Sequence, residues 1–503
     1  MSRQCDGAVT RLKKELFLRH AWFLALFVLA GVALPFGIRE GNDWGGDFAV
    51  YILEARNFAE HRPFYETSYV PTPESLVHHP AVYPPLASLL LAPVYAVRGL
   101  DYRSMKLVLA LFLWLSFPLY YVIGCRRGVK PGAMAVILLL FVLSPLVLSL
   151  EQTVGSDFIF VFISALSLLT IDEIYRREWD IRRPLFAGVL AATLLFLCYL
   201  TRAAGLAMIG GFAAYELRRS RRVRVFSLIA GGITATAFLL YTNFLFDARG
   251  QYGSQFVRNP AIWAHNAIAY LQTPAVVWAA APAVIRYPLA AVTLCLAIAG
   301  FARRLRRPTL VEFYFALSVA VLVVYFVSDR RYMLPVIPFM LMYAAEALDT
   351  LMSRIESTRP DWKSAWRIGL ATCLLVALAT SFANLRVAET GPVRDGVSQP
   401  SFAELCDFLR LNIPPDGLIL SWNPRVLALY TGKHSALYPQ DSSPEIFQRA
   451  LPASGSRFLV FHQQDLDRQS LSPYLNYAGP RLGKRFENSD FQVFAIPDSP
   501  NRP

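Results

Sequence analysis

Stretches of apolar residues long enough to cross a lipid bilayer recur along the chain, and short arginine-rich segments separate many of them. A membrane-spanning helix needs about 20 consecutive, mostly apolar residues. Of the 503 residues, 55% are hydrophobic and 17% are charged, whereas about a quarter of the residues of a soluble domain are charged. The sequence therefore predicts a polytopic α-helical membrane protein. About 11 transmembrane helices are expected, at 20–38, 104–123, 132–150, 157–174, 185–200, 204–217, 225–246, 283–301, 311–328, 334–350 and 368–386.

The arginine-rich segments indicate how the chain is oriented. Four of them, at 124–131, 175–184, 218–224 and 302–308, each lie between two expected helices. Cytoplasmic loops of membrane proteins carry an excess of Lys and Arg, so the N-terminus is expected in the cytoplasm and the C-terminus outside. The same placement explains the net charge of +13 without a nucleic-acid partner, and none is expected. The expected location is the inner (plasma) membrane, crossed several times.

The polarity of the chain predicts two domains. Residues 1–386 form the expected membrane domain, with a long first outer loop at 39–103. A second outer segment, at 247–282, is moderately polar and rich in aromatic residues, as in a helix that lies on the membrane surface. This segment is a candidate lid over an outer site. Residues 387–503 are polar enough to form an extracytoplasmic domain.

Short apolar runs in the tail predict an α/β fold for this extracytoplasmic domain. Ser401 and Glu404 have the spacing of a helix capping box, followed by an apolar stripe that includes Phe402 and Leu405. A short helix is expected to end at Gly432, because glycine is common just after the last helical turn. Strands are expected at 417–422, 457–462 and 491–496.

Two aspartates lie at helix boundaries on the predicted outer side. Asp47 follows Gly45 and Gly46 and begins a stretch with helical spacing, while Asp157 begins the fourth expected helix. Both positions also suit a simple helix N-cap. Carboxylates at membrane depth are costly and commonly functional, so both are candidate catalytic residues. The two glycines would allow a tight turn and the close approach of a ligand.

Basic residues form a second group of candidates. Arg330 and Arg331 lie between two expected spanning helices, whereas the other short outer loops carry few positive charges. An arginine guanidinium matches the oxygen atoms of a phosphate, and contact with lipid headgroups is the plainer alternative. Arg202 lies at a break between two short helices, where a charge without an anionic partner would be costly.

Metal ligands are not evident in the sequence. The six cysteines form no CxxC pair, which argues against a thiolate zinc site. No metal site and no required cofactor are therefore assigned from the residues themselves.

In order along the chain, these residues resemble the GT-C membrane glycosyltransferases. The resemblance is strongest to the branch that contains protein O-mannosyltransferases and bacterial lipid A aminoarabinose transferases. It extends over about residues 20–350 in the order of the family's motifs. The motifs are Asp47 with Tyr51 four residues later, YPPL from Tyr83, SD at Ser156–Asp157, LTRAAGL around Arg202, and RYMLPVIPF from Arg331.

The resemblance implies a sugar transfer on the outer face, from a polyprenyl-phosphate carrier to an acceptor. In the family, the acidic residue of the first outer loop is the catalytic base, a role that falls on Asp47 here. The second aspartate of the family corresponds to Asp157, and its Arg-Tyr pair to Arg331 and Tyr332. Direct displacement at the sugar carbon predicts inversion. The expected substrate-binding residues are Tyr51, Tyr83, Arg202, Arg330, Arg331 and Tyr332.

The chain departs from the family pattern at two positions. Phe48 stands where the family often has a second acidic residue, so Glu54 or Asp157 would have to replace it, and a divalent metal stays open as a cofactor. Tyr83 stands where some members have a lysine, so one phosphate contact does not transfer.

The expected partners are a polyprenyl-phosphate sugar donor, membrane lipid and an acceptor that is a lipid, a glycan or a protein. The main alternative is a transporter or lipid flippase, which would place charges in mid-helix along a path. An O-antigen ligase or polymerase would have its long outer loop late in the chain, and a non-catalytic scaffold would not need Asp47.

Overall fold

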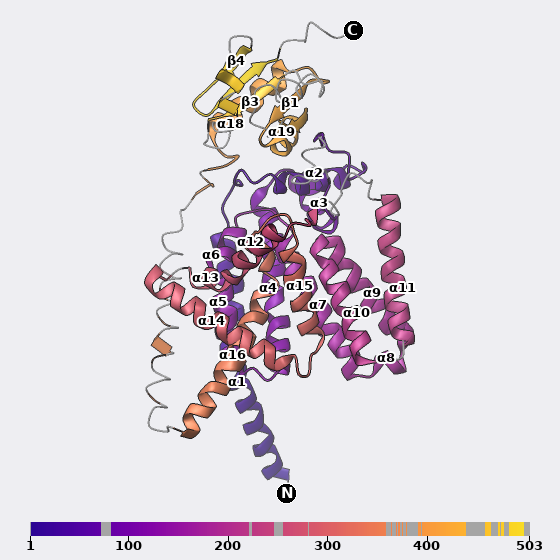
Figure 1. Cartoon of the computed structure of the whole chain (residues 1–503), viewed down its shortest axis with the longest axis vertical. Helices are drawn as coiled ribbons and strands as arrows, with labels where there is room; N and C mark the ends of the chain where they lie inside the picture. The colour runs from indigo at the N-terminus through magenta and orange to yellow at the C-terminus, as the bar shows by residue number, and fades with distance from the viewer. Residues whose placement is uncertain are drawn as a thin grey trace.

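The chain folds into a helical body that carries a small five-stranded sheet near its C-terminal end (Figure 1). The structure, a computed structural model, describes residues 2–71, 82–220, 224–245, 255–279, 281–358, 391–393, 395–438, 458–463 and 482–496, and isolated positions in 364–379 and 471–476. In Figure 1 the sheet lies at the end of the molecule opposite the N-terminus.

Six helices of the described part are long and apolar enough to cross a membrane. This agrees with the predicted multi-pass membrane protein, whereas the count of about 11 helices and the orientation stay predictions. The expected helix at 368–386 falls largely outside the described residues. The six spans are His20–Gly37 within α1 (Ser2–Gly37), α4 (Tyr102–Arg126), α7 (Asp157–Arg176), α9 (Pro184–Thr201), Val225–Asn243, which starts with α11 (Val225–Leu240), and α14 (Ala283–Arg304).

Shorter helices complete the body. Three of them are apolar, namely α3 (Leu86–Arg98), α5 (Pro131–Val142) and α15 (Leu310–Val323). The others described before residue 359 are α2 (Asp47–Ala59), α6 (Pro145–Leu150), α8 (Trp179–Arg182), η1 (Ala203–Gly205), α10 (Leu206–Arg219), η2 (Tyr241–Leu245), α12 (Pro260–Leu271), α13 (Thr273–Val277), η4 (Arg330–Met333) and α16 (Ile337–Thr358).

Two helices that were expected to be continuous are shorter than predicted. The expected helix at 132–150 divides into α5 and α6, because Ser144 is extended (φ −64°, ψ 138°) in front of Pro145, and a residue before proline avoids the helical conformation. The expected helix at 311–328 ends at Val323, because Tyr325 pairs instead with Phe256 in an isolated antiparallel bridge.

Glycines let several helices approach each other closely. A Cβ at Gly300 of α14 would lie 2.1 Å from the carbonyl oxygen of Tyr343 in α16. A Cβ at Gly211 of α10 would lie 3.1 Å from the Cα of Tyr314 in α15. Small residues at crossings allow such backbone contact between membrane helices, so these two helix pairs are packed backbone against backbone.

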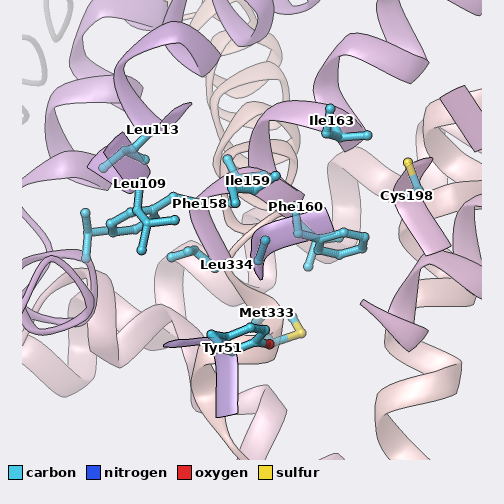
Figure 2. Packing of buried hydrophobic residues seen from close by; sticks show 14 of the residues in the cluster. Tyr51, Leu109, Leu113, Phe158, Ile159, Phe160, Ile163, Cys198, Met333 and Leu334 are labelled. Atoms are coloured by element: carbon cyan, nitrogen blue, oxygen red, sulfur yellow. The ribbon is translucent and has the colours of Figure 1, made fainter. Parts of the chain in front are cut away.

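Buried apolar side chains fill the space between the helices. One cluster includes Leu109 of α4 and Ile159 of α7, which are 1% and 0% exposed, together with Leu334 after η4. Tyr51 of α2 and Met333 belong to the same cluster, part of which Figure 2 shows. The core therefore extends up to the segments that carry the acidic and basic candidates.

Ion pairs connect helix ends at the arginine-rich segments. Arg127 Nη2 lies 2.5 Å from Glu312 Oε1, and Arg304 Nε lies 2.6 Å from Glu346 Oε2. The side chains of Arg127 and Glu312 are almost fully buried, and a buried charge requires such a partner. The positive charges that predicted the orientation thus also connect α4, α14, α15 and α16.

The tail contains a mixed sheet in the order β2-β1-β3-β5-β4. Strand β1 is parallel to β2 and β3, whereas β5 is antiparallel to β3 and β4. The three predicted strands are present as β1, β3 and β5, and the predicted short helix is α19, with Gly432 as its left-handed C-cap. The elements are α18 (Pro400–Asn412), β1 (Leu418–Ser421), α19 (Pro424–Thr431), β2 (His434–Leu437), β3 (Phe458–His462), β4 (Gly483–Glu487) and β5 (Phe491–Ala495).

The predicted capping box at Ser401 and Glu404 is wrong. Helix α18 starts one residue earlier, at Pro400, and Gln399 is its N-cap. Proline is favoured at the first helical position because its missing N–H is not needed there. Ser401 therefore lies inside the first turn, and Glu404 Oε2 accepts a hydrogen bond from Asn488 Nδ2 at 3.0 Å.

Both faces of the sheet are buried. Val460 of β3 and Val493 of β5 belong to the cluster that continues into the helical body. Leu459, Phe461 and Phe494 form a second cluster. Since neighbouring residues of a strand point to opposite faces, one face of the sheet packs toward the membrane domain and the other supports the tail itself.

The tail packs on the segment between α1 and α2. Val393 N donates to the carbonyl of Glu40 (2.8 Å), and Val397 N donates to the carbonyl of Asn42 (3.0 Å). The ring of Trp44 contacts the ring of Phe402 edge-on, with 5.1 Å between centroids. The segment that leads into Asp47 is therefore held in place by residues of the C-terminal domain.

Candidate functional site

A cavity of about 510 Å³ lies at the end of the helical body where α2 is found, and Figure 1 shows α2 next to the tail. Its lining comes from α2 and the segments on either side of it, the segment before α7, the α9–α10 junction, residues 255–256 and the connection between α15 and α16. Seven of the eight candidate residues line it: Asp47, Tyr51, Tyr83, Asp157, Arg202, Arg331 and Tyr332.

Asp47 is the first residue of α2, and its carboxylate has three donors. The Tyr83 hydroxyl donates to Oδ1 (2.6 Å), Arg425 Nη1 donates to Oδ1 (3.2 Å), and Arg331 Nη2 donates to Oδ2 (2.8 Å). The N-cap position belongs to Gly46, which has no side chain that could cap the helix. The carboxylate is thus directed at two guanidinium groups instead of capping its own helix.

Electrostatics keep Asp47 ionised. Burial opposes ionisation, but the positive charges of Arg331 and Arg425 and the hydrogen bond from Tyr83 outweigh it, so the pKa of Asp47 lies well below its usual range. Nearby opposite charges stabilise the ionised form of a carboxyl group. Asp47 is therefore a carboxylate at neutral pH.

Gly46, directly before Asp47, allows a close contact with Asn423 of the tail. Neither Gly45 nor Gly46 has a positive φ. A Cβ at Gly46 would lie 2.8 Å from Asn423 Oδ1, and Asn423 Nδ2 donates to the carbonyl of Trp44. Glycine at position 46 therefore makes room for the start of α19 from the C-terminal domain.

Tyr83 is held from several sides. Its ring stacks on that of Tyr51 with 4.9 Å between centroids and 21° between planes, and its backbone N–H donates to Glu54 Oε1 (2.8 Å). Burial raises the pKa of the Tyr83 hydroxyl well above its usual range, so the hydroxyl stays a donor to Asp47. The Tyr51 hydroxyl forms a hydrogen bond with Ser156 Oγ (2.8 Å).

Asp157 and Arg202 form an ion pair on the other side of the cavity. Asp157 is the first residue of α7 and Ser156 occupies the N-cap position. Arg202 lies at the junction of α9 and η1, as the sequence predicts. The side chains are 16% and 11% exposed for Arg202 and Asp157, so the arginine at this helix break does have the anionic partner that its burial requires.

Tyr332 lies between the two arginines that face the cavity. The guanidinium carbons of Arg202 and Arg331 are each 5.2 Å from the centroid of its ring. An aromatic ring face attracts a cation at such distances. Arg331 also pairs with Asp329, with 2.8 Å between Nε and Oδ2. The connection between α15 and α16 thus presents a fixed guanidinium to the cavity.

Arg330 does not join this group. Its Nη2 donates to Gln272 Oε1 (3.2 Å), near the end of α12, and it is not part of the cavity lining. Residues 330 and 331 lie on neighbouring positions of the one-turn helix η4, so their side chains leave it in different directions. Of the predicted arginine pair, the structure places Arg331 alone against the cavity.

Arg425 is a site residue that sequence reasoning missed. It belongs to α19 of the C-terminal domain, 378 positions after Asp47, and its side chain is 2% exposed. Its Nη1 also donates to the Tyr83 hydroxyl (3.0 Å). One signal was available, namely a charged residue at the start of a short helix whose other positions are mostly apolar.

The segment before α12 reaches one wall of the cavity. Gln255 and Phe256 line it, and the Tyr325 hydroxyl donates to Gln255 Oε1 (2.7 Å). Asn266 Nδ2 of α12 donates to the carbonyl of Tyr325 (2.6 Å). The expected helix of the candidate lid is α12, while its role as a lid stays a prediction and residues 246–254 lie outside the described residues.

The carboxylates of the cavity have guanidinium and hydroxyl partners. In the described part of the chain, no three side chains of His, Cys, Asp or Glu come together. Asp47 accepts hydrogen bonds from Arg331, Arg425 and Tyr83, and Asp157 pairs with Arg202. Glu54, the alternative second carboxylate, points away, to the backbone of Tyr83 and to Ser88.

The sequence matches no known protein family and no curated protein. Its fold, in contrast, is similar to several solved structures. The crystal structure of ArnT from Cupriavidus metallidurans in the apo state has a TM-score of 0.60 at 15% identity, covering 96% of this chain and 99% of that one. The structure of ArnT bound to undecaprenyl phosphate has a TM-score of 0.59 at 14% identity, with 95% and 98% covered.

A third similar structure is the archaeal oligosaccharyltransferase AglB from Archaeoglobus fulgidus, in complex with an inhibitory peptide and a dolichol-phosphate. Its TM-score is 0.53 at 13% identity, covering 93% of this chain and 73% of that one. Identities this low establish the fold and not the activity. The chain therefore shares the fold of ArnT and AglB, which agrees with the fold expected from the resemblance of its motifs.

Proposed function

We propose that this protein transfers a sugar from a polyprenyl-phosphate carrier to a hydroxyl group of a lipid, glycan or protein acceptor, at the outer face of the plasma membrane. One observation carries the proposal: a carboxylate, Asp47, and a guanidinium, Arg331, line the same cavity in contact with each other. The first can accept a proton, and the second can bind the phosphate of the donor.

Ligands of the similar structures support this choice of donor. ArnT was solved with undecaprenyl phosphate, and AglB with a dolichol-phosphate. Both ligands combine one phosphate with a long apolar chain. The cavity described here offers Arg202 and Arg331 to a phosphate, and the surrounding helices offer apolar surface to the chain.

A second cavity provides a place for the polyprenyl chain. It has a volume of about 610 Å³ and lies among α9, α10 and α11. Its lining is mostly apolar, from residues such as Leu195, Ile209 and Phe238. Leu206 at one end follows shortly after Arg202, which lines the first cavity. A donor with its phosphate near Arg202 would therefore direct its tail along an apolar groove.

The proposed reaction is a direct displacement at the anomeric carbon. The acceptor oxygen forms a bond to this carbon, while the bond from carbon to phosphate oxygen breaks and leaves its electron pair on the phosphate. The acceptor proton goes to Asp47. The donor, a phosphodiester with one negative charge, becomes a polyprenyl phosphate with two. Attack from the side opposite the leaving group inverts the sugar carbon.

Arg331 takes part both in the proton transfer to Asp47 and in the departure of the phosphate. In the ligand-free arrangement it stabilises the ionised form of Asp47. As the leaving phosphate gains its second charge, the same guanidinium is drawn toward the phosphate. Asp47 then loses part of the positive field that keeps its pKa low, so it becomes a better base when the proton arrives. Asp157 is proposed to orient Arg202.

Transfer by the purified full-length protein tests this proposal. A radiolabelled polyprenyl-phosphate sugar is supplied in lipid vesicles together with a panel of membrane acceptors. Asp47→Asn is expected to lower the transfer rate by about 10²–10⁴-fold, the usual contribution of a general base. Asp407→Asn serves as the control, because Asp407 pairs with Arg410 on the exposed side of α18.

Equal transfer by both variants would contradict the role of Asp47. Movement of the labelled lipid between leaflets without any covalent transfer would instead identify a flippase. In that case Asp47→Asn would change lipid movement and not product formation.

A further inference from the structure

The two arginines that contact Asp47 differ in their access to the cavity. The side chain of Arg331 is 29% exposed and lines the cavity, whereas that of Arg425 is 2% exposed and does not. A phosphate entering the cavity can reach Arg331. Arg425 lies behind Asp47 and Tyr83, so both of them separate it from any ligand.

Arg425 is fixed by its surroundings. Its guanidinium carbon lies 5.3 Å from the centroids of the Tyr69 and Tyr83 rings, which places two aromatic faces against the cation. Two residues earlier, Asn423 contacts Gly46 and donates to the carbonyl of Trp44. The start of α19 therefore contacts both the approach to Asp47 and the Asp47 carboxylate.

We propose that Arg425 is a positioning residue through which the C-terminal domain orients the Asp47 carboxylate, while Arg331 binds the donor phosphate. This inference rests on the proposed function and assigns separate tasks to the two arginines. The site is then incomplete without the C-terminal domain, even though none of the described residues of this domain lines the cavity.

Charge balance supports this division of tasks. Asp47 shares Arg331 with Asp329, and a bound phosphate becomes a third anion at the same guanidinium. Arg425 Nη1 lies 3.2 Å from Asp47 Oδ1, its side chain is 2% exposed, and it does not line the cavity. When the donor binds, Arg425 is the cation that stays with Asp47, because its burial leaves it no route to the ligand.

Kinetics of the full-length protein distinguish the two arginines. In Arg331→Met the KM for the donor is expected to rise about tenfold or more, since hydrogen bonds to charged groups contribute that much to affinity. In Arg425→Met the donor KM is expected to stay near that of the wild type, while kcat falls. Arg485→Met is the control, because Arg485 is an exposed arginine of β4 in the same domain.

The pH profile supplies a readout that a purely structural role would not change. Without Arg425, Asp47 keeps its burial and loses one of its two positive neighbours, so its protonation shifts to higher pH. The acid limb of kcat/KM is expected to move upward by about one to three pH units in Arg425→Met. Arg425→Lys keeps the charge and is expected to leave the acid limb close to that of the wild type.

Two results would overturn the inference. One is an acid limb that is the same in Arg425→Met, Arg485→Met and the wild type. The other is a donor KM that rises in Arg425→Met as it does in Arg331→Met, which would make Arg425 a phosphate ligand. Failure of the wild type itself to transfer sugar would refute the proposed function instead.

A measurement without turnover tests the pairing in every case. Apparent melting temperatures are compared for Asp47→Asn, Arg425→Met and the double variant in detergent. Direct pairing predicts that the effects of the single variants do not add, because each removes the same interaction. Additive effects would show that the two side chains do not cooperate.

Discussion

Glu54 of α2 supports the site through its contact with Tyr83, which lines the cavity. It is fully buried, and its carboxyl group accepts hydrogen bonds from the Tyr83 backbone N–H (2.8 Å) and the Ser88 hydroxyl (2.6 Å). Burial raises the pKa of Glu54 from 4.5 to about 8. At neutral pH this side chain is therefore largely protonated in the folded protein, while it would be ionised in the unfolded chain.

Glu54→Gln is expected to flatten the dependence of stability on pH. As pH rises from about 4.5 toward about 8, the unfolded chain releases the Glu54 proton first, so the wild type loses stability across this window. A glutamine can still accept from Tyr83 and donate to Ser88, and it does not titrate. Melting temperatures at several pH values check this, and parallel curves for variant and wild type would contradict it.

The residues of the site differ in how readily the sequence alone identifies them. Asp47, Asp157 and Arg331 each lie at a helix boundary, where polar residues interrupt long apolar runs, so pattern alone locates them. Arg425 lies in another domain, and its contact with Asp47 depends on how that domain docks. Sequence spacing carries no information about such docking.

Among the elements, the packing of α14 on α16 gives the sharpest prediction. Gly300→Ala places a methyl group 2.1 Å from the Tyr343 carbonyl oxygen, which is backbone and cannot move aside cheaply. The expected loss is about 1–3 kcal/mol, the usual cost of overpacking, seen as a lower melting temperature. Gly232→Ala in α11 is the control, because nothing lies within 4 Å of its Cβ position.

The control variant is expected to be neutral or to gain up to about 1 kcal/mol, since alanine is a better helix former than glycine. Equal melting temperatures for Gly300→Ala and Gly232→Ala would show that α14 and α16 are not packed as described. Both variants carry the same substitution in a membrane helix, so they differ only in what surrounds the added methyl group.

The strands of the tail show why some elements are easier to predict from the sequence than others. The apolar runs of β1, β3 and β5 predict strands directly, and these three form the centre of the sheet. Strands β2 and β4 are its edges, and β4, with the sequence GKRFE, is mostly exposed. Edge strands commonly carry charged residues that prevent pairing with other molecules, so β4 lacks the apolar pattern by which inner strands are found.

At the scale of the whole molecule, the tail and the segment between α1 and α2 form one unit next to Asp47. Gly396 lies at their contact, where a Cβ would be 1.9 Å from the carbonyl oxygen of Asn42. The hydrogen bond from Val397 N to the same oxygen (3.0 Å) depends on this approach. Displacement of the tail would therefore disturb the segment that leads into Asp47.

Gly396→Ala is expected to reduce sugar transfer without unfolding the helical body. The added methyl group separates the tail from residues 40–42, and Asp47 loses its fixed position. Transfer rates and limited proteolysis, compared with those of Gly132→Ala, check this, because the Cβ position of Gly132 has no neighbour within 4 Å. Wild-type transfer and wild-type cleavage by Gly396→Ala would show that this docking does not support the site.

The central claim is that Arg331 and Asp47 face the phosphate of a polyprenyl donor in one cavity. A structure of the full-length protein in a lipid nanodisc with undecaprenyl phosphate tests it most directly. We expect the phosphate inside the cavity, within hydrogen-bond distance of Arg331, with Asp47 still in contact with Arg425. A phosphate bound elsewhere on the protein, out of reach of Arg331, would contradict the account.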